Sequence, residues 1–218
     1  MMEKENISKI MEILMNHFSL DRKTTLNRMR ENPDPYKVLI GCIVSINIKD
    51  AVTEKILEEL FKKVSSFQDM INIDIEELEK MLYLARYRRV KAARLKSISK
   101  EILEKFDGKV PENKENLLSI KGIGPKTANV VLNFAYNHPV IPIDSNTIRI
   151  VNRLGWINGK NPEKTEKMLI ENLDENNLKN ANAVFMLHGK NICTPVSPFC
   201  SRCPINEFCT KIGVINSR

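Results

Sequence analysis

The sequence predicts an all-α fold of about ten helices. Apolar residues recur at three- and four-residue steps, the period of one helix face, in several segments of the chain. Asp34-Pro35 and Asn161-Pro162 each place a capping side chain directly before a proline, an order that is typical of a helix start. Alternating strand patterns are scarce, and the extended candidate, residues 140–143, is interpreted as a linker.

Two helices are predicted from apolar spacing and a third from the residues at its ends. The spaced residues are Ile7, Ile10, Met11, Leu14 and Phe18 in the first helix and Ile56, Leu57, Leu60, Phe61 and Val64 in the second. The third helix should begin after Asp144 and stop at Gly155, because glycine commonly terminates helices. Cys42, in the apolar run VLIGCIVSI, is expected to be a buried small hydrophobe.

Length and composition indicate a globular protein of one large or two small domains. The chain has 218 residues, of which 42% are hydrophobic and 28% are charged. No apolar run reaches the roughly 18–20 residues that a membrane helix needs, and the first residues, MMEKENISKI, have no signal-peptide core. We therefore expect a cytoplasmic or nucleoid-associated protein that does not contact a membrane.

The charge of the chain favours an anionic partner. The net charge is +7, although an ordinary basic protein would show this too. The distribution is more informative, because the residues between 86 and 100 include seven Lys or Arg and no Asp or Glu. A solvated helix face usually mixes signs, so this basic stretch favours contact with phosphate groups, and a basic helix packed against an acidic neighbour is the alternative. The basic stretch consists of Arg86, Arg88, Arg89, Lys91, Arg94, Lys96 and Lys100.

Four of the five cysteines are clustered, with the spacing Cys-x6-Cys-x2-Cys-x5-Cys. In a protein expected to be cytoplasmic, clustered thiols indicate metal ligands rather than disulfides. They could hold a zinc ion or a cubane iron–sulfur cluster. Zinc sites usually show two short Cys-x2–4-Cys pairs, and here one pair is that short, so the spacing favours the cluster. The four are Cys193, Cys200, Cys203 and Cys209.

The segment LLSIKGIGPKTANVVL, residues 117–132, is predicted to form a helix, a tight turn and a second helix. Gly122 and Gly124 allow a turn whose backbone N–H groups point outward, and the second helix, starting near Pro125, adds its positive end. Such a hairpin can hold a DNA phosphate without reading sequence. A glycine-rich hairpin buried in a core is the alternative.

Lys126 falls in the first turn of that second helix. A positive helix end, nearby cations and partial desolvation all favour the free amine of a lysine, which is the form that attacks a sugar carbon. A surface lysine that contacts phosphate fits the same position equally well. Position alone leaves both interpretations open.

Two segments carry a resemblance to a known family: LLSIKGIGPKTANVVLNFAYNHPVIPIDSNTIRIVNRLG and, after it, MLHGKNICTPVSPFCSRCPINEFC. They closely resemble the endonuclease III group of helix-hairpin-helix DNA glycosylases, and the likeness runs from about residue 20 to 212 in one register. The resemblance implies one helical domain over residues 28–138 with the hairpin. It implies a second over residues 1–27 and 139–218 with a [4Fe-4S] cluster in the loop 193–209, and a DNA groove between the two.

The resemblance also implies the roles of individual residues. Lys126 matches the family's Schiff-base lysine, and Asp144 matches its essential aspartate, although an N-cap on the following helix would also explain Asp144. Asn47 falls where the family has the glutamine that fills the gap left by a flipped base, and Tyr87 where an apolar wedge intercalates. The residues expected to contact DNA are Gly122, Gly124, Asn47, Tyr87, Arg88 and Arg89.

Four departures from the family pattern concern DNA contact and the choice of substrate. Residues 45–47 read Ser-Ile-Asn rather than an SAQ-like segment, and residues 86–88 read Arg-Tyr-Arg rather than Gly-Leu-Tyr. The aspartate is followed by Ser145-Asn146 instead of Thr-His. The cysteine-loop segment TPVSPF has no basic residue, so Arg202, Lys190 or the basic stretch would have to bind phosphate in its place.

The expected function is removal of a damaged or deaminated pyrimidine from double-stranded DNA, followed by cleavage at the abasic site through a lysine Schiff base. The enzyme would act as a monomer on DNA that contains a lesion or mismatch. One alternative is a monofunctional glycosylase for mismatched uracil or thymine that uses water instead of Lys126. The others are a non-catalytic lesion-sensing DNA-binding protein, which retention of both Lys126 and Asp144 argues against, and a zinc-binding scaffold.

Overall fold

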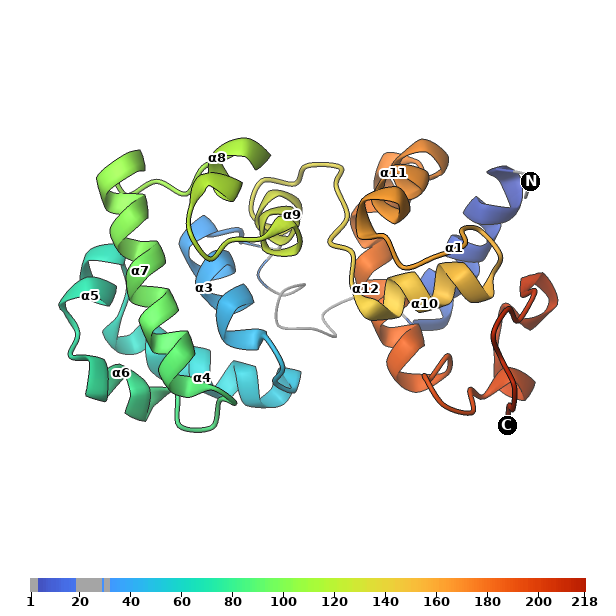
Figure 1. Cartoon of the computed structure of the whole chain (residues 1–218), viewed down its shortest axis with the longest axis horizontal. Coiled ribbons are helices and arrows are strands. Elements are labelled where there is room, and N and C mark those ends of the chain that lie inside the picture. The colour runs from blue at the N-terminus through green and yellow to red at the C-terminus, as the bar shows by residue number, and fades with distance from the viewer. Residues whose placement is uncertain (1–3, 19–28, 30–31) are drawn as a thin grey trace. The chain divides into compact units, whose positions relative to one another are not determined.

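The computed structural model of the chain describes residues 4–18, 29 and 32–218. Within these residues it contains eleven α-helices, two 3-10 helices and no strand, so the all-α prediction is confirmed (Figure 1). The helices are α1 Lys4–Phe18, α3 Pro35–Ser45, α4 Asp50–Lys63, α5 Phe67–Asn72, α6 Ile75–Met81, α7 Arg88–Phe106, α8 Lys114–Ser119, α9 Pro125–Phe134, α10 Ser145–Arg153, α11 Pro162–Asn172, α12 Glu175–Asn191, η1 Cys200–Arg202 and η2 Asn206–Phe208. None of the described helices is long and apolar enough to cross a membrane.

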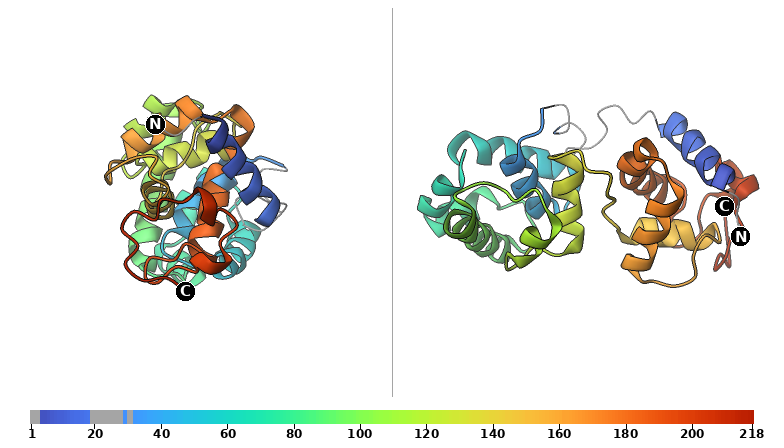
Figure 2. Two further views of the ribbon diagram at one scale, coloured as in Figure 1. Left: turned by 90° about the vertical axis from the view of Figure 1, so that its right-hand side faces the viewer. Right: turned by 90° about the horizontal axis from the view of Figure 1, so that it is seen from above.

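The chain divides into two compact units (Figure 2). Met1–Asp21 and His138–Arg218 form one, which we call the cysteine unit, and Arg22–Asn137 form the other, which we call the hairpin unit. The cysteine unit therefore joins a helix from near the start of the chain, α1, to α10–α12 and the cysteine loop.

The core of the cysteine unit is formed where α1 and α10 pack against α12. The five apolar residues predicted to line one face of the first helix, from Ile7 to Phe18, are all buried there. Phe185 of α12 is fully buried among them, and its ring meets the ring of Trp156 edge-on. The periodic spacing of apolar residues in α1 was therefore a correct guide to its buried face.

In the hairpin unit, α3 packs against α9, while α5 and α6 pack against α7. Every residue of α3 from Val38 to Val44 is buried, which confirms Cys42 as a core residue. In α4 and the residue after it, Ile56, Leu57, Leu60 and Val64 are buried and Phe61 is half-buried. The predicted apolar face of this helix is confirmed.

The helix ends follow the capping signals in the sequence. Asp34 Oδ1 accepts a hydrogen bond from the N–H of Lys37 at 3.2 Å, and Asn161 Oδ1 accepts one from the N–H of Lys164 at 3.0 Å. Gly155 adopts φ 75° just beyond the end of α10, a left-handed conformation that favours glycine. These local signals were sufficient to predict where α3, α10 and α11 begin or end.

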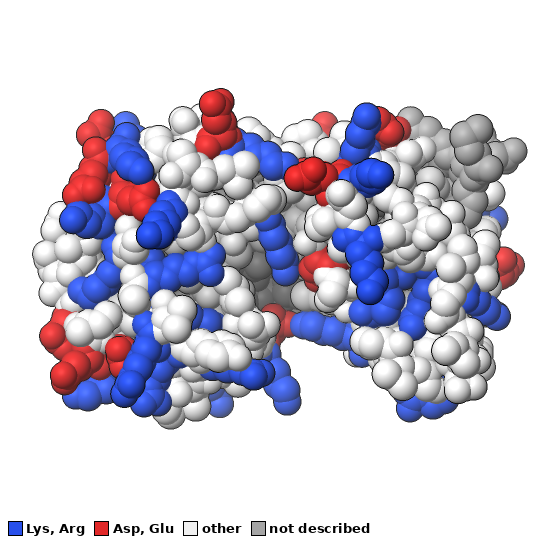
Figure 3. All heavy atoms as spheres, viewed as in Figure 1, with Lys and Arg blue, Asp and Glu red and all other residues white. Residues whose placement is uncertain are grey.

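Three members of the basic stretch bind carbonyl groups of the protein itself, a role that the sequence pattern did not indicate. Lys91 and Lys96 each donate to two backbone carbonyls at the end of a neighbouring helix, and Arg94 Nη2 donates to the carbonyl of Gly122. Carbonyls at helix C-termini lack partners within their own helix and attract cations. On the face seen in Figure 3, Lys and Arg side chains gather over the region of α7.

Candidate functional site

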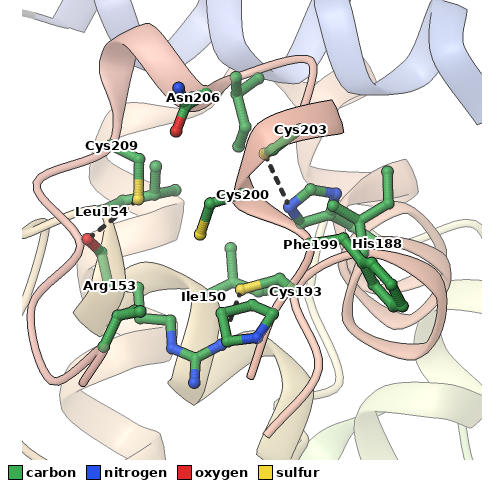
Figure 4. A pocket seen from close by; sticks show the side chains of 14 residues that line it. Ile150, Arg153, Leu154, His188, Cys193, Phe199, Cys200, Cys203, Asn206 and Cys209 are labelled. Atoms are coloured by element: carbon green, nitrogen blue, oxygen red, sulfur yellow. Dashed lines mark hydrogen bonds between the residues drawn. The ribbon is translucent and has the colours of Figure 1, made fainter. Parts of the chain in front are cut away.

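The four clustered cysteines line one pocket of the cysteine unit (Figure 4). Cys193 follows α12, Cys200 begins η1, and Cys203 and Cys209 directly follow η1 and η2. Their sulfur atoms face a common hollow. The space between the lining side chains, open solvent at its mouth included, measures about 380 Å³. The rest of the wall is mainly apolar, with Ile150, Leu154, Ile192, Pro198, Ile205 and Val214 among the lining residues.

Arg153, at the end of α10, organises the cysteine loop. Its buried guanidinium donates to the carbonyls of Thr194 and Pro195 at 2.8 and 2.9 Å and lies 3.2 Å from Cys193 Sγ. Its own carbonyl accepts from Cys209 Sγ at 3.3 Å and from the hydroxyl of Thr210 at 3.0 Å. Sequence reasoning missed Arg153, because the residues that it joins are about 40 and 57 positions away.

His188 is a second residue of the pocket that the sequence analysis did not single out. Its ring is buried in α12, with Nε2 3.8 Å from Cys203 Sγ and Nδ1 without a hydrogen-bond partner among the described residues. Burial lowers the pKa of His188 to about 4, helped by the charges of His17 and Arg149, so the ring is neutral at physiological pH. A histidine five positions before Cys193, within the segment MLHGKNIC, is the sequence feature that could have indicated this residue.

Four cysteine sulfur atoms that face one hollow are donors suited to a metal centre. Burial, together with the charges of the other three cysteines, raises the pKa of the Cys203 thiol to about 11, so a thiolate at this position needs a compensating cation. A tetrahedral zinc site would place sulfur atoms about 3.8 Å apart, given a Zn–S bond of about 2.3 Å. Among the described residues, no group of three or more His, Cys, Asp or Glu is arranged to hold one ion.

The surface of the cysteine loop is basic even though TPVSPF is not. The guanidinium groups of Arg202 and Arg218 each lie 3.9 Å from the centre of the Phe199 ring. Arg218 also donates from Nε to the carbonyl of Ser197 at 3.0 Å, which ties it to the loop. Arg202 was anticipated as a cation for this region, whereas Arg218 comes to the loop only through folding.

The predicted hairpin is formed by α8, a turn at residues 120–124 and α9. Gly122 adopts φ 100°, which a residue with a side chain rarely does, and the N–H of Ile123 donates to the carbonyl of Ile120 at 3.0 Å. Gly124 is the N-cap of α9, and no side chain of the described part of the chain caps that helix. The first backbone N–H groups of α9 are therefore available to an anion.

Lys126 is exposed in the first turn of α9, as the hairpin prediction required. The adjacent Thr127 is buried and interacts with the Cys42 thiol of α3. Burial raises the pKa of that thiol, and the charge of Lys126 opposes the rise. The exposed amine of Lys126 therefore extends from a turn of α9 that is anchored to α3 through the next residue, Thr127.

Asp144 is the N-cap of α10. Its Oδ1 accepts hydrogen bonds from the N–H and hydroxyl of Thr147 at 2.8 and 3.1 Å, so one oxygen is used in capping. Its Oδ2 accepts from Asn146 Nδ2 at 3.3 Å. Asp144 is half-buried, and the cap reading that sequence reasoning left open is therefore correct, without excluding a further role for the carboxylate.

A chain of hydrogen bonds runs from Asp144 to the cysteine loop. Arg149 Nη2 donates to Asn146 Oδ1 at 2.8 Å, and Arg149 Nε donates to the carbonyl of Cys193 at 3.0 Å. A Cβ placed on Gly189 of α12 would lie 2.8 Å from the Cβ of Asn146, an atom that cannot move without its backbone, and closer than real Cβ atoms approach. The close contact between α10 and α12 therefore depends on glycine at this position.

The two expected DNA-opening residues lie in the hairpin unit. Asn47 is exposed in the turn after α3 with φ 58°, and Tyr87, 57% exposed, is the N-cap of α7 with φ 60°. Arg86 stacks on Tyr87, with its guanidinium carbon 4.9 Å from the ring centre. Arg88 is exposed, and Arg89 is exposed with Nε 3.4 Å from Glu79. Lys126 belongs to the hairpin unit and Asp144 to the cysteine unit, and their meeting stays a prediction.

Comparison with known proteins defines the class to which this fold and site belong. Residues 40–175 match the HhH-GPD superfamily of base excision DNA repair proteins, and the chain belongs to this superfamily. Within it, the chain is similar to endonuclease III of Thermotoga maritima, with 35% identity over 84% of this chain and 85% of that protein. Endonuclease III of Haemophilus influenzae is 31% identical over 84% of this chain and 92% of that protein. The chain is thus a base-excision DNA glycosylase of the endonuclease III type.

Solved structures give the same result for the fold. A trapped covalent intermediate of endonuclease III with DNA is similar with a TM-score of 0.85 and 26% identity, covering 97% of both chains. A thermostable thymine-DNA glycosylase shares the fold with a TM-score of 0.83 and 22% identity, covering 93% of this chain and 94% of that one. The predicted resemblance to the endonuclease III family is confirmed.

Proposed function

We propose that this protein removes damaged or deaminated pyrimidines from double-stranded DNA and then cleaves the abasic site through a Schiff base on Lys126. The observation that carries the proposal is an exposed amine in the first turn of α9, directly beyond a glycine turn whose helix N–H groups have no side-chain cap. Similarity to an endonuclease III that forms a covalent intermediate with DNA supports it.

In the first step the bond between the base and C1′ of the sugar breaks, and the bonding electrons leave with the base. The carboxylate of Asp144 stabilises the developing positive charge on the sugar. Within the described part of the chain its Oδ2 accepts one long hydrogen bond, from Asn146 at 3.3 Å, and so retains lone pairs for this task. The hydrogen bonds from Thr147 hold Oδ1 in place.

In the second step the free amine of Lys126 attacks C1′ and, after ring opening, forms an imine. Loss of a proton from C2′ and departure of the 3′ phosphate then break the strand, and water releases the enzyme. The first N–H groups of α9 bind phosphate close to the amine. Binding and chemistry thus come from consecutive residues of one hairpin.

We propose that Cys193, Cys200, Cys203 and Cys209 hold a [4Fe-4S] cluster. The support is the hollow that the four thiols share and the raised pKa of Cys203, whose thiolate needs a cation beside it. When bound, the cluster supplies structural order to the loop, and no bond-breaking step depends on it. Arg153 and His188 would donate hydrogen bonds toward the sulfur atoms, as their distances to Cys193 and Cys203 indicate.

The purified protein should be yellow-brown, with broad absorbance near about 400 nm from charge transfer between thiolate and iron. Replacing any of the four loop cysteines with serine should abolish this band and the bound iron. Cys42→Ser is the matched control and should keep both, because Cys42 is buried in α3 of the hairpin unit. Metal analysis that finds one zinc and no iron in anaerobically prepared protein contradicts the cluster.

DNA binding should depend steeply on salt, because each neutralised phosphate contributes a slope of about −0.9 in log affinity against log salt. Arg88→Ala and Arg89→Ala should each weaken binding equally on damaged and undamaged duplexes and flatten the slope by about 0.9. Lys62→Ala, which removes an exposed cation paired with Glu59 at 2.6 Å, is the control. Unchanged slopes for both arginine variants would show that these residues face away from DNA.

The function itself is tested with a panel of duplexes, each containing one oxidised pyrimidine, uracil or mismatched thymine, in the presence and absence of borohydride. The proposal predicts release of a base, strand cleavage and a borohydride-trapped covalent complex on at least one of them. Base release without trapping would identify a monofunctional glycosylase instead. Binding without release of any base would identify a non-catalytic protein.

A further inference from the structure

Among the described residues, Lys91 is the most deeply buried lysine, with 5% of its surface exposed. Its ammonium group donates to the carbonyls of Val44 and Ile46, at 2.5 and 2.6 Å. Both carbonyls belong to the end of α3, whose last turn contains no basic residue of its own. Lys91, which belongs to α7, therefore places a positive charge at the C-terminal end of α3.

These two carbonyls belong to the residues one and three positions before Asn47. The turn is closed by one backbone hydrogen bond, from the N–H of Ile48 to the carbonyl of Ser45 at 3.1 Å. Asn47 then adopts φ 58°, a left-handed conformation that asparagine adopts more readily than most residues do. Contacts around the turn help to hold this conformation, and Lys91 makes them on the side of α3.

The same lysine is also fixed to the Tyr87 loop. Tyr87 lies one helical turn before Lys91, and the N–H of Lys91 donates to the carbonyl of Tyr87 at 3.0 Å. One residue therefore joins the two loops, through its side chain to the turn of Asn47 and through its backbone to Tyr87. Asn47 and Tyr87 are exposed, whereas the lysine between them is buried.

We propose that Lys91 is a positioning residue of the glycosylase, which holds Asn47 and Tyr87 at a fixed separation so that they enter the DNA duplex together. The inference rests on the proposed function and adds a residue that touches neither the base nor the sugar. Arg94, one turn further along α7, makes a similar contact with the carbonyl of Gly122 in the hairpin. The helix α7 thus contacts all three loops that the hairpin unit is expected to present to DNA.

Burial lowers the pKa of Lys91 to about 8, and the nearby charge of Arg94 adds to the shift. Because this value is still above 7, the amine of Lys91 is mainly protonated at neutral pH and can donate to both carbonyl oxygens. A buried methionine of similar length would fill the same space without donating to either carbonyl. Lys91→Met is therefore the variant that removes the hydrogen bonds and keeps the packing.

The chain contains a matched control in the same helix. Lys96 Nζ donates to the carbonyls of Ile71, at 2.7 Å, and of Ile73, both at the end of α5. Lys96→Met removes the same kind of contact between α7 and a helix end, but at a place where no DNA-opening residue is expected. Any effect that comes only from a loosened α7 should appear in both variants.

Excision is measured on a lesion in a paired duplex and on the same lesion in a single strand, where no helix has to be opened. Lys91→Met should slow the duplex reaction about 10-fold or more and the single-strand reaction less than about threefold. Lys96→Met should change both rates by the same factor. Lys91→Arg, which keeps a cationic donor, should restore most of the duplex rate. Equal losses of Lys91→Met on both substrates overturn the proposal.

Hydrogen exchange gives a second readout that does not depend on activity. In Lys91→Met the amide of Ile48 should exchange about 10-fold faster or more, while amides in the middle of α9 remain unchanged. If Lys91→Met does not fold, Lys91→Gln, which retains one donor group, is compared in the same way. An unchanged rate at Ile48 overturns the proposal. If the wild-type protein excises no lesion, but Lys91→Met still speeds exchange at Ile48, the proposed function is overturned. The contact between Lys91 and the turn of Asn47 is then still supported.

Discussion

Lys126→Gln should abolish both borohydride trapping and strand cleavage at an abasic site, to below about one thousandth of the wild-type rate. Glutamine has no amine that can form an imine, and nothing else in the first turn of α9 can replace it. Affinity for DNA should fall much less, because the free backbone N–H groups of the hairpin still bind phosphate. Trapping and cleavage assays on an abasic duplex, together with binding isotherms, separate the two effects.

Lys121→Gln is the control for this variant. Lys121 is an exposed lysine of the same hairpin, and its backbone N–H donates to Glu101 at 3.1 Å, so the turn should remain intact. It should keep trapping and cleavage. If Lys126→Gln still releases the free base and loses only strand cleavage, water performs the first attack and the monofunctional alternative gains. Normal trapping in Lys126→Gln would remove Lys126 from the chemistry.

Asp144→Asn should lower base removal by about 100-fold or more, because a carboxylate facing a developing sugar cation typically contributes several kcal/mol. Asparagine caps a helix as well as aspartate does, so the hydrogen bond to the N–H of Thr147 and the stability of α10 should survive. Cleavage of a preformed abasic site should change much less, since that step needs the amine of Lys126.

The capping role of Asp144 provides its own control. Asp144→Ala should lose both the charge and the cap, and its free energy of unfolding should fall by about 1 kcal/mol relative to Asp144→Asn. Thermal melts distinguish the two variants, and single-turnover base release should be low in both. Base release by Asp144→Asn at the wild-type rate would reduce Asp144 to a helix cap.

Short-range signals in the sequence predicted much of the fold. The caps at Asp34 and Asn161 and the buried face of α1 depend on residues three to four positions apart, and such patterns can be read directly. The four cysteines also lie within one short segment, and the structure brings them to one pocket as the spacing indicated. Their bound group is still a proposal.

Long-range contacts were the part that sequence alone could not supply. The lysine at position 91 looks the same in the sequence as the exposed arginines beside it, and only folding shows that it is buried against α3. Arg153 and Arg218 reach the cysteine loop from other parts of the chain for the same reason. Charge counted along a sequence does not distinguish a cation that binds a partner from one that binds a carbonyl.

The contact at Gly189 restricts how this sequence can change over time. The glycine leaves room for Asn146 and Arg149, and Arg149 also donates to the carbonyl of Gly189 at 3.0 Å. A larger residue at position 189 becomes tolerable only after position 146 or 149 has become smaller, and then the bond from Arg149 to the cysteine loop is lost or weakened. In related chains, positions 146, 149 and 189 should therefore vary together, although 189 is about 40 residues away from the other two along the chain.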